Sequence, residues 1–173
     1  DQLRHFPDLL LTFPELEDIL RRCLDETGLL KDEASPELRS LRRRVRALGE
    51  EIEQRLHNTL RSSQAKDVVT DQYITIRNNR FVIPVRPNFH TRLQGIVQDR
   101  SGSGETVFIE PIFAVELNNR LLLARKEVEA EEHRLYLWLT DLVREELPRL
   151  EGVFAALVEV DILHAKTLLA QKH

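Results

Sequence analysis

The fold is decided by the stretch Thr75-Ile76-Arg77-Asn78-Asn79-Arg80-Phe81-Val82-Ile83-Pro84-Val85. β-branched and aromatic residues dominate on both sides of Asn78-Asn79, which is typical of two strands joined by a turn. Asparagine tolerates the positive φ angles that a two-residue primed hairpin turn requires. The stretch therefore predicts an antiparallel hairpin in which Arg77 lies opposite Arg80. Pro84 has no backbone N–H to donate, so we expect its strand to lie at a sheet edge or to contain a bulge.

A second hairpin is predicted directly after the first. Residues 93–100 and 105–109 again have strand patterns, and the small residues Ser101-Gly102-Ser103-Gly104 separate them. This glycine-rich turn has the composition of a phosphate-binding loop, but no predicted helix begins after it and no Gly-Lys-Ser/Thr follows, so a P-loop is excluded. The two hairpins together predict a small antiparallel sheet.

Helical patterns flank the predicted sheet on both sides. Residues 14–27 carry apolar residues at helical spacing, and Gly28 follows as the expected helix stop. Ser35-Pro36 predicts the start of a second, long helix that continues to residue 62. After the sheet the helical pattern returns over residues 112–147. Pro148 is expected to end or kink that helix, and a further helix is predicted over residues 153–170.

The order of these elements predicts the fold class. We expect an α+β, mainly α protein with long antiparallel helices and a small antiparallel β-sheet inserted at their tip. Each long helix has an apolar stripe that pairing would remove from water. Opposite charges favour a register that brings Arg42, Arg43, Arg44 and Arg46 near Glu129, Glu131 and Glu132. The predicted division is a helical part, residues 1–65 and 112–173, and a β-rich part, residues 66–111.

Composition excludes several classes of protein. The 173 residues are 42% hydrophobic and 31% charged, which fits one ordinary domain or two small ones. The formal net charge of -4 excludes a uniformly basic nucleic-acid binder. The lone Cys23 has apolar helical neighbours, so we predict a reduced, packed thiol in a cytoplasmic protein. No apolar run reaches the roughly 20 residues of a membrane helix, and we expect no membrane partner. Because the chain lacks methionine and stops inside a helical pattern, we expect a segment of a longer protein.

Positive charge is concentrated on the predicted sheet. Residues 77–100 contain five arginines and one aspartate, a net charge of +4 in an acidic chain. Arginine binds phosphate through paired hydrogen bonds, and an aromatic ring beside it can stack on a base. We interpret the segment as a nucleic-acid-binding surface with the candidate residues Tyr73, Arg77, Arg80, Arg86, Arg92 and Arg100. The alternative is a solvated edge in which Arg77 and Arg80 pair with Asp99, Glu105 or Glu110.

Other chemistries find little support in the residue pattern. No nucleophile elbow, Cys–His pair or compact carboxylate dyad stands out, so we expect no catalytic residue. The histidines are scattered, and the pairs Glu53/His57 and Glu129/His133 have no recognisable third ligand, so we expect no metal site. For Asn118-Asn119 we expect a polar helix face or a contact with the base of the sheet, with ligand binding as the alternative.

Five motifs along the chain resemble one known family. They are Gly28-Leu29-Leu30-Lys31-Asp32-Glu33-Ala34-Ser35, the stretch 75–86, Gly95-Ile96-Val97-Gln98-Asp99 with its continuation to Phe108-Ile109-Glu110-Pro111, Glu116-Leu117-Asn118-Asn119, and Val160-Asp161-Ile162-Leu163-His164-Ala165-Lys166. In this order they resemble the bacterial MutS family of the second type, the paralogue that lacks the mismatch-reading domains. Gln98 stands where this resemblance implies a histidine.

The resemblance implies both an architecture and a function. The helical part would be the core and lever of a MutS-type-two protein, and the β-rich part its clamp. This non-catalytic segment would contact the backbone of branched or duplex DNA, or ribosomal RNA, in suppression of homologous recombination or in ribosome rescue. The resemblance implies a homodimeric parent whose ATPase domain, with ATP and Mg²⁺, and nuclease domain lie outside these residues. The segment itself could be monomeric and needs no cofactor. The alternative function is a coiled-coil scaffold for protein interaction or dimerisation without nucleic-acid contact.

Overall fold

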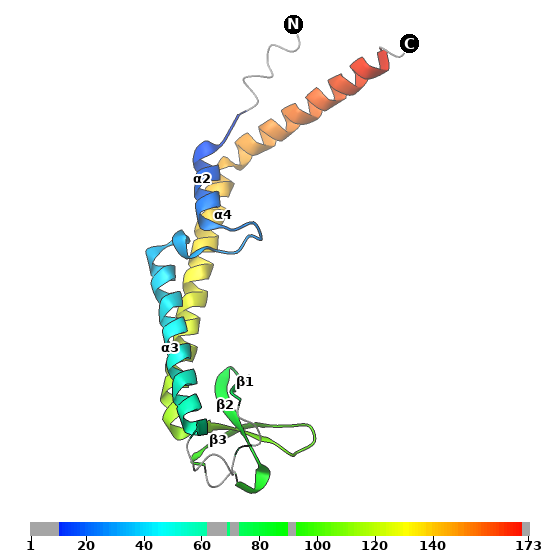
Figure 1. Ribbon diagram of the computed structural model, residues 1–173. Coiled ribbons are helices and arrows are strands. Elements are labelled where there is room, and N and C mark those ends of the chain that lie inside the picture. Colours follow the sequence, from blue (N-terminus) through cyan, green and yellow to red (C-terminus); the bar gives the residue numbers. More distant parts are fainter. Residues whose placement is uncertain (1–10, 62–68, 70–72, 90–92, 171–173) are drawn as a thin grey trace. The chain divides into compact units, whose positions relative to one another are not determined.

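The computed structural model describes residues 11–61, 69, 73–89 and 93–170 (Figure 1). The chain divides into two compact units, one formed by Ser35–Glu131 and the other by Asp1–Ala34 with Glu132–His173. Helices dominate, and the strands form a four-stranded antiparallel sheet in the first of these units. The predicted fold class, mainly α with a small antiparallel sheet, is confirmed.

In the unit Ser35–Glu131, two helices lie side by side (Figure 1). Helix α3 spans Pro36–Arg61, and helix α4 spans Ile112–Ala170, of which residues 112–131 belong to this unit. The helix α3 begins as predicted, because the Leu38 backbone N–H donates to the Ser35 Oγ over 2.9 Å. Apolar residues of both helices pack into one core: Leu48, Ile52, Leu56 and Leu60 from α3, and Ala114, Leu117, Leu121 and Ala124 from α4.

Two contacts between these helices give their direction. The Ser35 hydroxyl donates to Glu131 over 2.7 Å, and the Arg44 Nη1 donates to Glu127 over 2.7 Å. The order of the two pairs along the chain is antiparallel, as predicted. The expected register was wrong for Arg44, because its observed partner Glu127 precedes all three acidic residues expected near it. Surface charge pairs are too weak to fix a register alone, and the packed apolar seam decides it.

The sheet contains strands β1 (Thr75–Arg77), β2 (Arg80–Val85), β3 (Gly95–Arg100) and β4 (Val107–Pro111). Their order is β1-β2-β4-β3. The predicted primed turn is confirmed, because Asn78 and Asn79 have φ angles of 52° and 61° and Arg77 pairs with Arg80. The second predicted hairpin is also confirmed as the β3–β4 pair. One face of the sheet packs on the two helices through Phe81, Ile83, Val85, Val107 and Ile109.

The expectation that Pro84 lies in an edge strand was wrong. Its strand β2 is an inner strand, flanked by β1 and β4, and the irregularity of the sheet lies instead in β3 between Val97 and Asp99. In a two-residue hairpin the residues beside the turn exchange hydrogen bonds, so even-numbered residues of β2 direct their backbone N–H groups toward β1. The pairing with β1 ends at Val82. Pro84 therefore lies beyond the part of β2 that pairs with β1, so its lack of an N–H costs no hydrogen bond to β1.

The other unit contains helix α2 (Pro14–Cys23) and the part of α4 after residue 131. Helix α2 ends four residues earlier than predicted, because Leu24 is extended and forms a bridge with Leu30. Gly28 has a φ of +83° within the turn between these two residues, so it does not stop the helix. Cys23 is buried and free, which confirms the predicted packed thiol.

Helix α4 is continuous through Pro148, so the expected helix end there and the separate helix over residues 153–170 were wrong, and the alternative of a kink stays a prediction. Proline has no N–H to donate to the Arg144 carbonyl, and such a position normally weakens a helix. Contacts within the unit support α4 on both sides of Pro148. The Tyr136 hydroxyl donates to the Gly28 carbonyl over 3.3 Å, and the Arg149 guanidinium lies 5.3 Å from the centroid of the Phe13 ring.

Candidate nucleic-acid interface on the sheet

Arg77, the last residue of β1, is held against the sheet. Its guanidinium lies 4.2 Å from the centroid of the Phe108 ring, and its Nε is 3.3 Å from the Asp99 Oδ2. Its Nη1 also donates to the Thr75 hydroxyl over 3.3 Å and to the Ile76 carbonyl over 2.9 Å. These contacts leave 38% of the Arg77 side chain exposed. Much of its hydrogen-bonding capacity is used inside the sheet.

Arg80, opposite Arg77, compensates a buried carboxylate. Its Nη1 donates to the Glu110 Oε1 over 2.7 Å, and its Nη2 donates to the Asn119 Oδ1 over 2.7 Å. The Glu110 side chain is 0% exposed and that of Arg80 is 23% exposed. A buried carboxylate is costly unless a counter-ion and hydrogen bonds satisfy it. The pairs Arg77–Asp99 and Arg80–Glu110 are two of those that the solvated-edge alternative expected.

Arg86 and Arg100 are placed differently. Both are exposed, and neither side chain forms an ion pair or hydrogen bond with another described residue. Val85 and Arg100 both lie opposite Val107, the first residue of β4, so Arg86 and Arg100 lie at the same end of the sheet. We call Arg86, Arg100 and the turn at residues 101–106 the distal end, because β4 enters helix α4 at its other end.

The turn of the distal end has well-defined hydrogen bonds. The Ser101 backbone N–H donates to the Thr106 carbonyl over 2.9 Å, and the Thr106 backbone N–H donates to the Ser101 hydroxyl over 3.0 Å. Gly104 has a φ of +75°, a conformation that favours glycine. A Cβ at Gly102 would meet no heavy atom within 4 Å. The turn therefore joins two strands, as predicted, and has open space beside Gly102.

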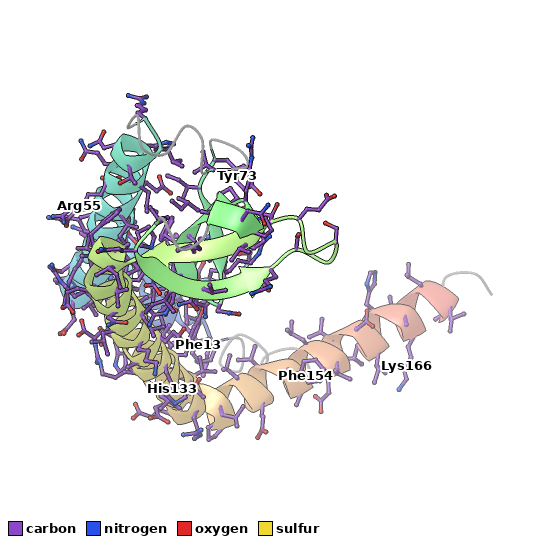
Figure 2. All side chains as sticks on the ribbon, turned by 90° about the horizontal axis from the view of Figure 1, so that it is seen from below. Phe13, Arg55, Tyr73, His133, Phe154 and Lys166 are labelled. Atoms are coloured by element: carbon purple, nitrogen blue, oxygen red, sulfur yellow. The ribbon has the colours of Figure 1, made fainter. Side chains whose placement is uncertain are left out.

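The two remaining candidate residues have different outcomes. Tyr73 lies just before β1 with 43% of its surface exposed (Figure 2). Arg92 lies outside the described residues, so its predicted role stays a prediction. The structure thus brings Arg77 and Arg80 together on opposed strands, and it places Arg86 and Arg100 at the distal end.

Sequence reasoning missed several partners around Glu110. The Gln98 side chain donates to the Glu110 Oε2 over 2.6 Å, and the Asn78 side chain donates to the Gln98 carbonyl over 2.8 Å. The bulge beside Gln98 had a signal in the sequence, because three consecutive polar residues, 98–100, interrupt the strand alternation. The contact between the Arg77 guanidinium and the Phe108 ring had no signal in the sequence, because only the folded sheet brings these two residues together.

Asn118 links the sheet to helix α4. Its Oδ1 accepts from the Phe81 backbone N–H over 3.0 Å, and its Nδ2 donates to the Phe81 carbonyl over 3.1 Å and to the Glu110 Oε1 over 2.9 Å. Asn118 is 1% exposed. The predicted contact between this asparagine pair and the base of the sheet is therefore confirmed.

Among the described residues, no group of three or more His, Cys, Asp or Glu side chains could hold a metal ion. None of the described helices is both long and apolar enough to cross a membrane.

These features define a class of protein: a mainly helical segment with an inserted antiparallel sheet that exposes arginines at one end. No family model matches the chain. Curated relatives named Endonuclease MutS2 do match it. The relative from Maridesulfovibrio salexigens is 41% identical over 85% of this chain, that from Geobacillus thermodenitrificans 40% over 99%, and that from Aquifex aeolicus 36% over 96%.

The matches support assignment of the chain to the MutS2 family, which agrees with the resemblance seen in its motifs. The aligned regions cover 19%, 22% and 22% of these relatives. The chain therefore spans about a fifth of the length of the curated relatives that it matches.

Proposed function

We propose that this chain is a non-catalytic lever and clamp segment of a MutS2 protein and that it contacts the backbone of nucleic acid. Residues 66–111 would be the β-rich clamp, and residues 1–65 and 112–173 the helical core and lever. Relatives of the chain carry the name of an endonuclease, an enzyme that cuts nucleic acid. ATP and Mg²⁺ would bind in the ATPase domain of the parent protein, and nuclease chemistry would also lie outside these residues.

The observation that carries this proposal is the pair of exposed arginines at the distal end. Arg86 and Arg100 have no carboxylate partner among the described residues, although the chain as a whole has a net charge of -4. A phosphate supplies the missing anion, and a guanidinium binds it through two parallel hydrogen bonds. We therefore assign the main phosphate contacts to Arg86 and Arg100, a smaller one to Arg77, and a supporting role to Arg80. Tyr73 offers an exposed ring for stacking.

The test uses the full-length parent protein with Arg86→Glu and Arg100→Glu combined. A matched control reverses two exposed helix arginines, Arg22→Glu and Arg43→Glu, which changes the net charge equally. Each phosphate contact contributes about 0.9 to the logarithmic salt slope on duplex DNA, so the distal-end variant should lose about 1.8. Gel shifts over a salt series, with junction DNA, duplex DNA and ribosomes as probes, measure affinity and slope. An unchanged affinity and slope for all three probes eliminates the proposal.

The three probes also distinguish the partners. Weaker binding to junction and duplex DNA alone assigns the distal end to recombination intermediates. Weaker binding to ribosomes alone assigns it to ribosomal RNA and ribosome rescue. Because the contacts are to the backbone, we expect binding to tolerate changes of base sequence.

The end of helix α4 favours a second candidate function, a scaffold for protein interaction or dimerisation. Phe154, Leu157 and Leu169 are 70%, 51% and 62% exposed, and Figure 2 shows Phe154 on this part of the helix. Large exposed apolar patches mark interaction sites. A mass that rises with concentration, without retardation of DNA or ribosomal RNA, would support the scaffold and contradict the nucleic-acid proposal.

A further inference from the structure

The ladder of hydrogen bonds between β2 and β4 is incomplete at one position. Ile83 pairs with Ile109 in an antiparallel register, so the residue opposite Phe81 would be Pro111. Proline has no N–H to donate, and the chain enters helix α4 at Ile112. Strand β4 therefore has no N–H at this position to donate to the Phe81 carbonyl.

The unsatisfied groups of Phe81 point toward β4. Arg77 and Arg80 flank the turn, so the ladder with β1 uses Arg80 and Val82 and leaves both backbone groups of Phe81 directed to the other side. Phe81 is 7% exposed. A buried backbone N–H or C=O without a partner is strongly unfavourable, so another group must replace the missing strand residue.

The side chain of Asn118 supplies both replacements. An amide has one acceptor and two donors, and here it accepts from the Phe81 N–H and donates to the Phe81 carbonyl as a neighbouring strand would. The second donated hydrogen bond reaches Glu110. A carboxamide suits this role because it accepts through its oxygen and donates through its nitrogen without carrying a charge.

Asn118 belongs to a larger set of buried and half-buried polar residues that joins three strands to α4. We call this set the polar dock: Arg80, Gln98, Glu110, Asn118 and Asn119. Within it, the Glu110 carboxylate accepts from Arg80, Asn118 and Gln98, and Asn119 accepts from Arg80. The bonds made by Asn118 and Asn119 depend on the rotation of α4 about its axis, because these two asparagines are consecutive helix residues.

We propose that Asn118 is the positioning residue that fixes the orientation of the sheet on helix α4. Its amide stands in for the strand residue that Pro111 cannot provide, and Glu110 holds the amide in the required orientation. The sheet and the start of α4 then move as one body. This inference goes beyond the proposed nucleic-acid contact and does not depend on it, because it rests on the geometry of the sheet alone.

The first test follows single backbone amides. Asn118→Leu removes both bonds to Phe81 and keeps a similar volume. We expect hydrogen exchange of the Phe81 amide, measured by NMR on the full chain, to accelerate at least about tenfold, as the loss of one protecting bond requires. The amides of Ile83 and Ile109 should keep their protection. Unchanged exchange at Phe81, or equal acceleration at all three amides, overturns the proposal.

The second test uses a matched pair of neighbouring substitutions. Asn118→Asp places a carboxylate that cannot donate beside buried Glu110, so we expect a lower melting temperature. Asn119→Asp makes the same chemical change one residue later, where Arg80 can pair with it, so we expect an equal or higher melting temperature. Equal loss in both variants contradicts the assignment.

A rescue variant keeps the second test decisive even if Asn118→Asp does not fold. Glu110→Gln combined with Asn118→Asp moves the negative charge to position 118 and restores a donor at position 110. The double variant should regain at least half of the lost melting temperature, or regain folding. Failure of the rescue overturns the proposed pairing of Asn118 with Glu110. DNA affinity plays no part in either readout, so the proposed function can fail while this inference stands.

Discussion

Arginine side chains have different surroundings at the two ends of the sheet. Near helix α4, Arg80 is paired with Glu110, and farther along the sheet Arg77 is paired with Asp99. At the distal end, Arg86 and Arg100 are exposed and form no ion pair with a described residue. The difference lies in the available partners, because the polar dock provides acceptors for Arg80 and Asp99 provides one for Arg77. Arginines of one cluster in the sequence can therefore stabilise the fold at one end and remain available for a ligand at the other.

The largest expected effect is the loss of Arg80. Arg80→Ala leaves the Glu110 carboxylate, which is 0% exposed, without its counter-ion. Breaking a buried pair costs about 3–5 kcal/mol, and we expect about 3 kcal/mol here because Gln98 and Asn118 still donate to Glu110. Urea unfolding measures this loss. Arg86→Ala is the control and should stay within about 0.5 kcal/mol of the original stability. Equal losses in the two variants would remove the contrast between the ends.

A second prediction compares two glycines from the same two regions. A Cβ at Gly95, next to the start of α4, would lie 2.4 Å from the Ile109 Cγ2 and 2.6 Å from the Glu110 carbonyl oxygen. Gly95→Ala should therefore lower the free energy of unfolding by about 1–3 kcal/mol, as overpacking does. Gly102→Ala, in the distal turn, should have little effect because nothing lies within 4 Å. Thermal unfolding of both variants checks the order.

Arg77 should give an intermediate effect. Its ion pair with Asp99 is partly exposed, at 38% and 46% of the two side chains, so solvent weakens it. With the contact to Phe108 included, Arg77→Ala should cost about 1 kcal/mol. Arg77→Lys keeps the charge but loses the planar fork, and should recover less than half of this loss. Full recovery by lysine in urea unfolding would show that charge alone matters at this position.

The smallest effect concerns a carboxylate that neutral donors satisfy. The Thr27 hydroxyl donates to the Asp25 Oδ1 over 2.7 Å, and the Leu29 and Thr27 backbone N–H groups donate to it as well. The Thr27 hydroxyl, then the Leu29 backbone, lowers the pKa of this carboxyl below its usual 3.8. A lowered folded-state pKa contributes stability above pH 3.8 that disappears as the pH falls through the folded value.

NMR titration of the Asp25 carboxyl checks this sign, and Thr27→Val is the matched variant. Removal of the hydroxyl should move the midpoint upward toward 3.8. An unchanged midpoint in Thr27→Val would assign the lowered pKa to the backbone donors and to the charge of Lys31. The comparison with Glu110 then contrasts two kinds of carboxylate. Asp25 is exposed and accepts hydrogen bonds from neutral donors, whereas Glu110 is buried in the sheet and pairs with the charged Arg80.

Local signals predicted the local parts of the fold. Asn78-Asn79 predicted the primed turn, Ser35 the start of α3, and the apolar neighbours of Cys23 its burial. These features depend on backbone preferences and side chains within a few residues of each other.

Features that depend on distant partners were not predicted as well. Pro148 lies inside a continuous helix, which is supported by contacts with residues distant in the sequence. Pro84 is tolerated in an inner strand because the pairing of β2 with β1 ends before it. The division of the arginines required the sheet itself, since Arg80 is separated in sequence from Glu110 by 30 positions and from Asn119 by 39. A cluster of like charges in a sequence gives the sum of the charges but not which of them a fold will neutralise.

The connection between β4 and α4 has a consequence for how such chains can vary in length. Pro111 is the last residue of the strand and Ile112 the first of the helix, with nothing between them. One inserted residue there would turn every following side chain by about 100° around the helix axis. Asn118 would lose its hydrogen bonds to Phe81, and the apolar residues of α4 would lose their packing against α3. Insertions and deletions should therefore collect in the 101–106 turn, where a loop can lengthen without rotating anything.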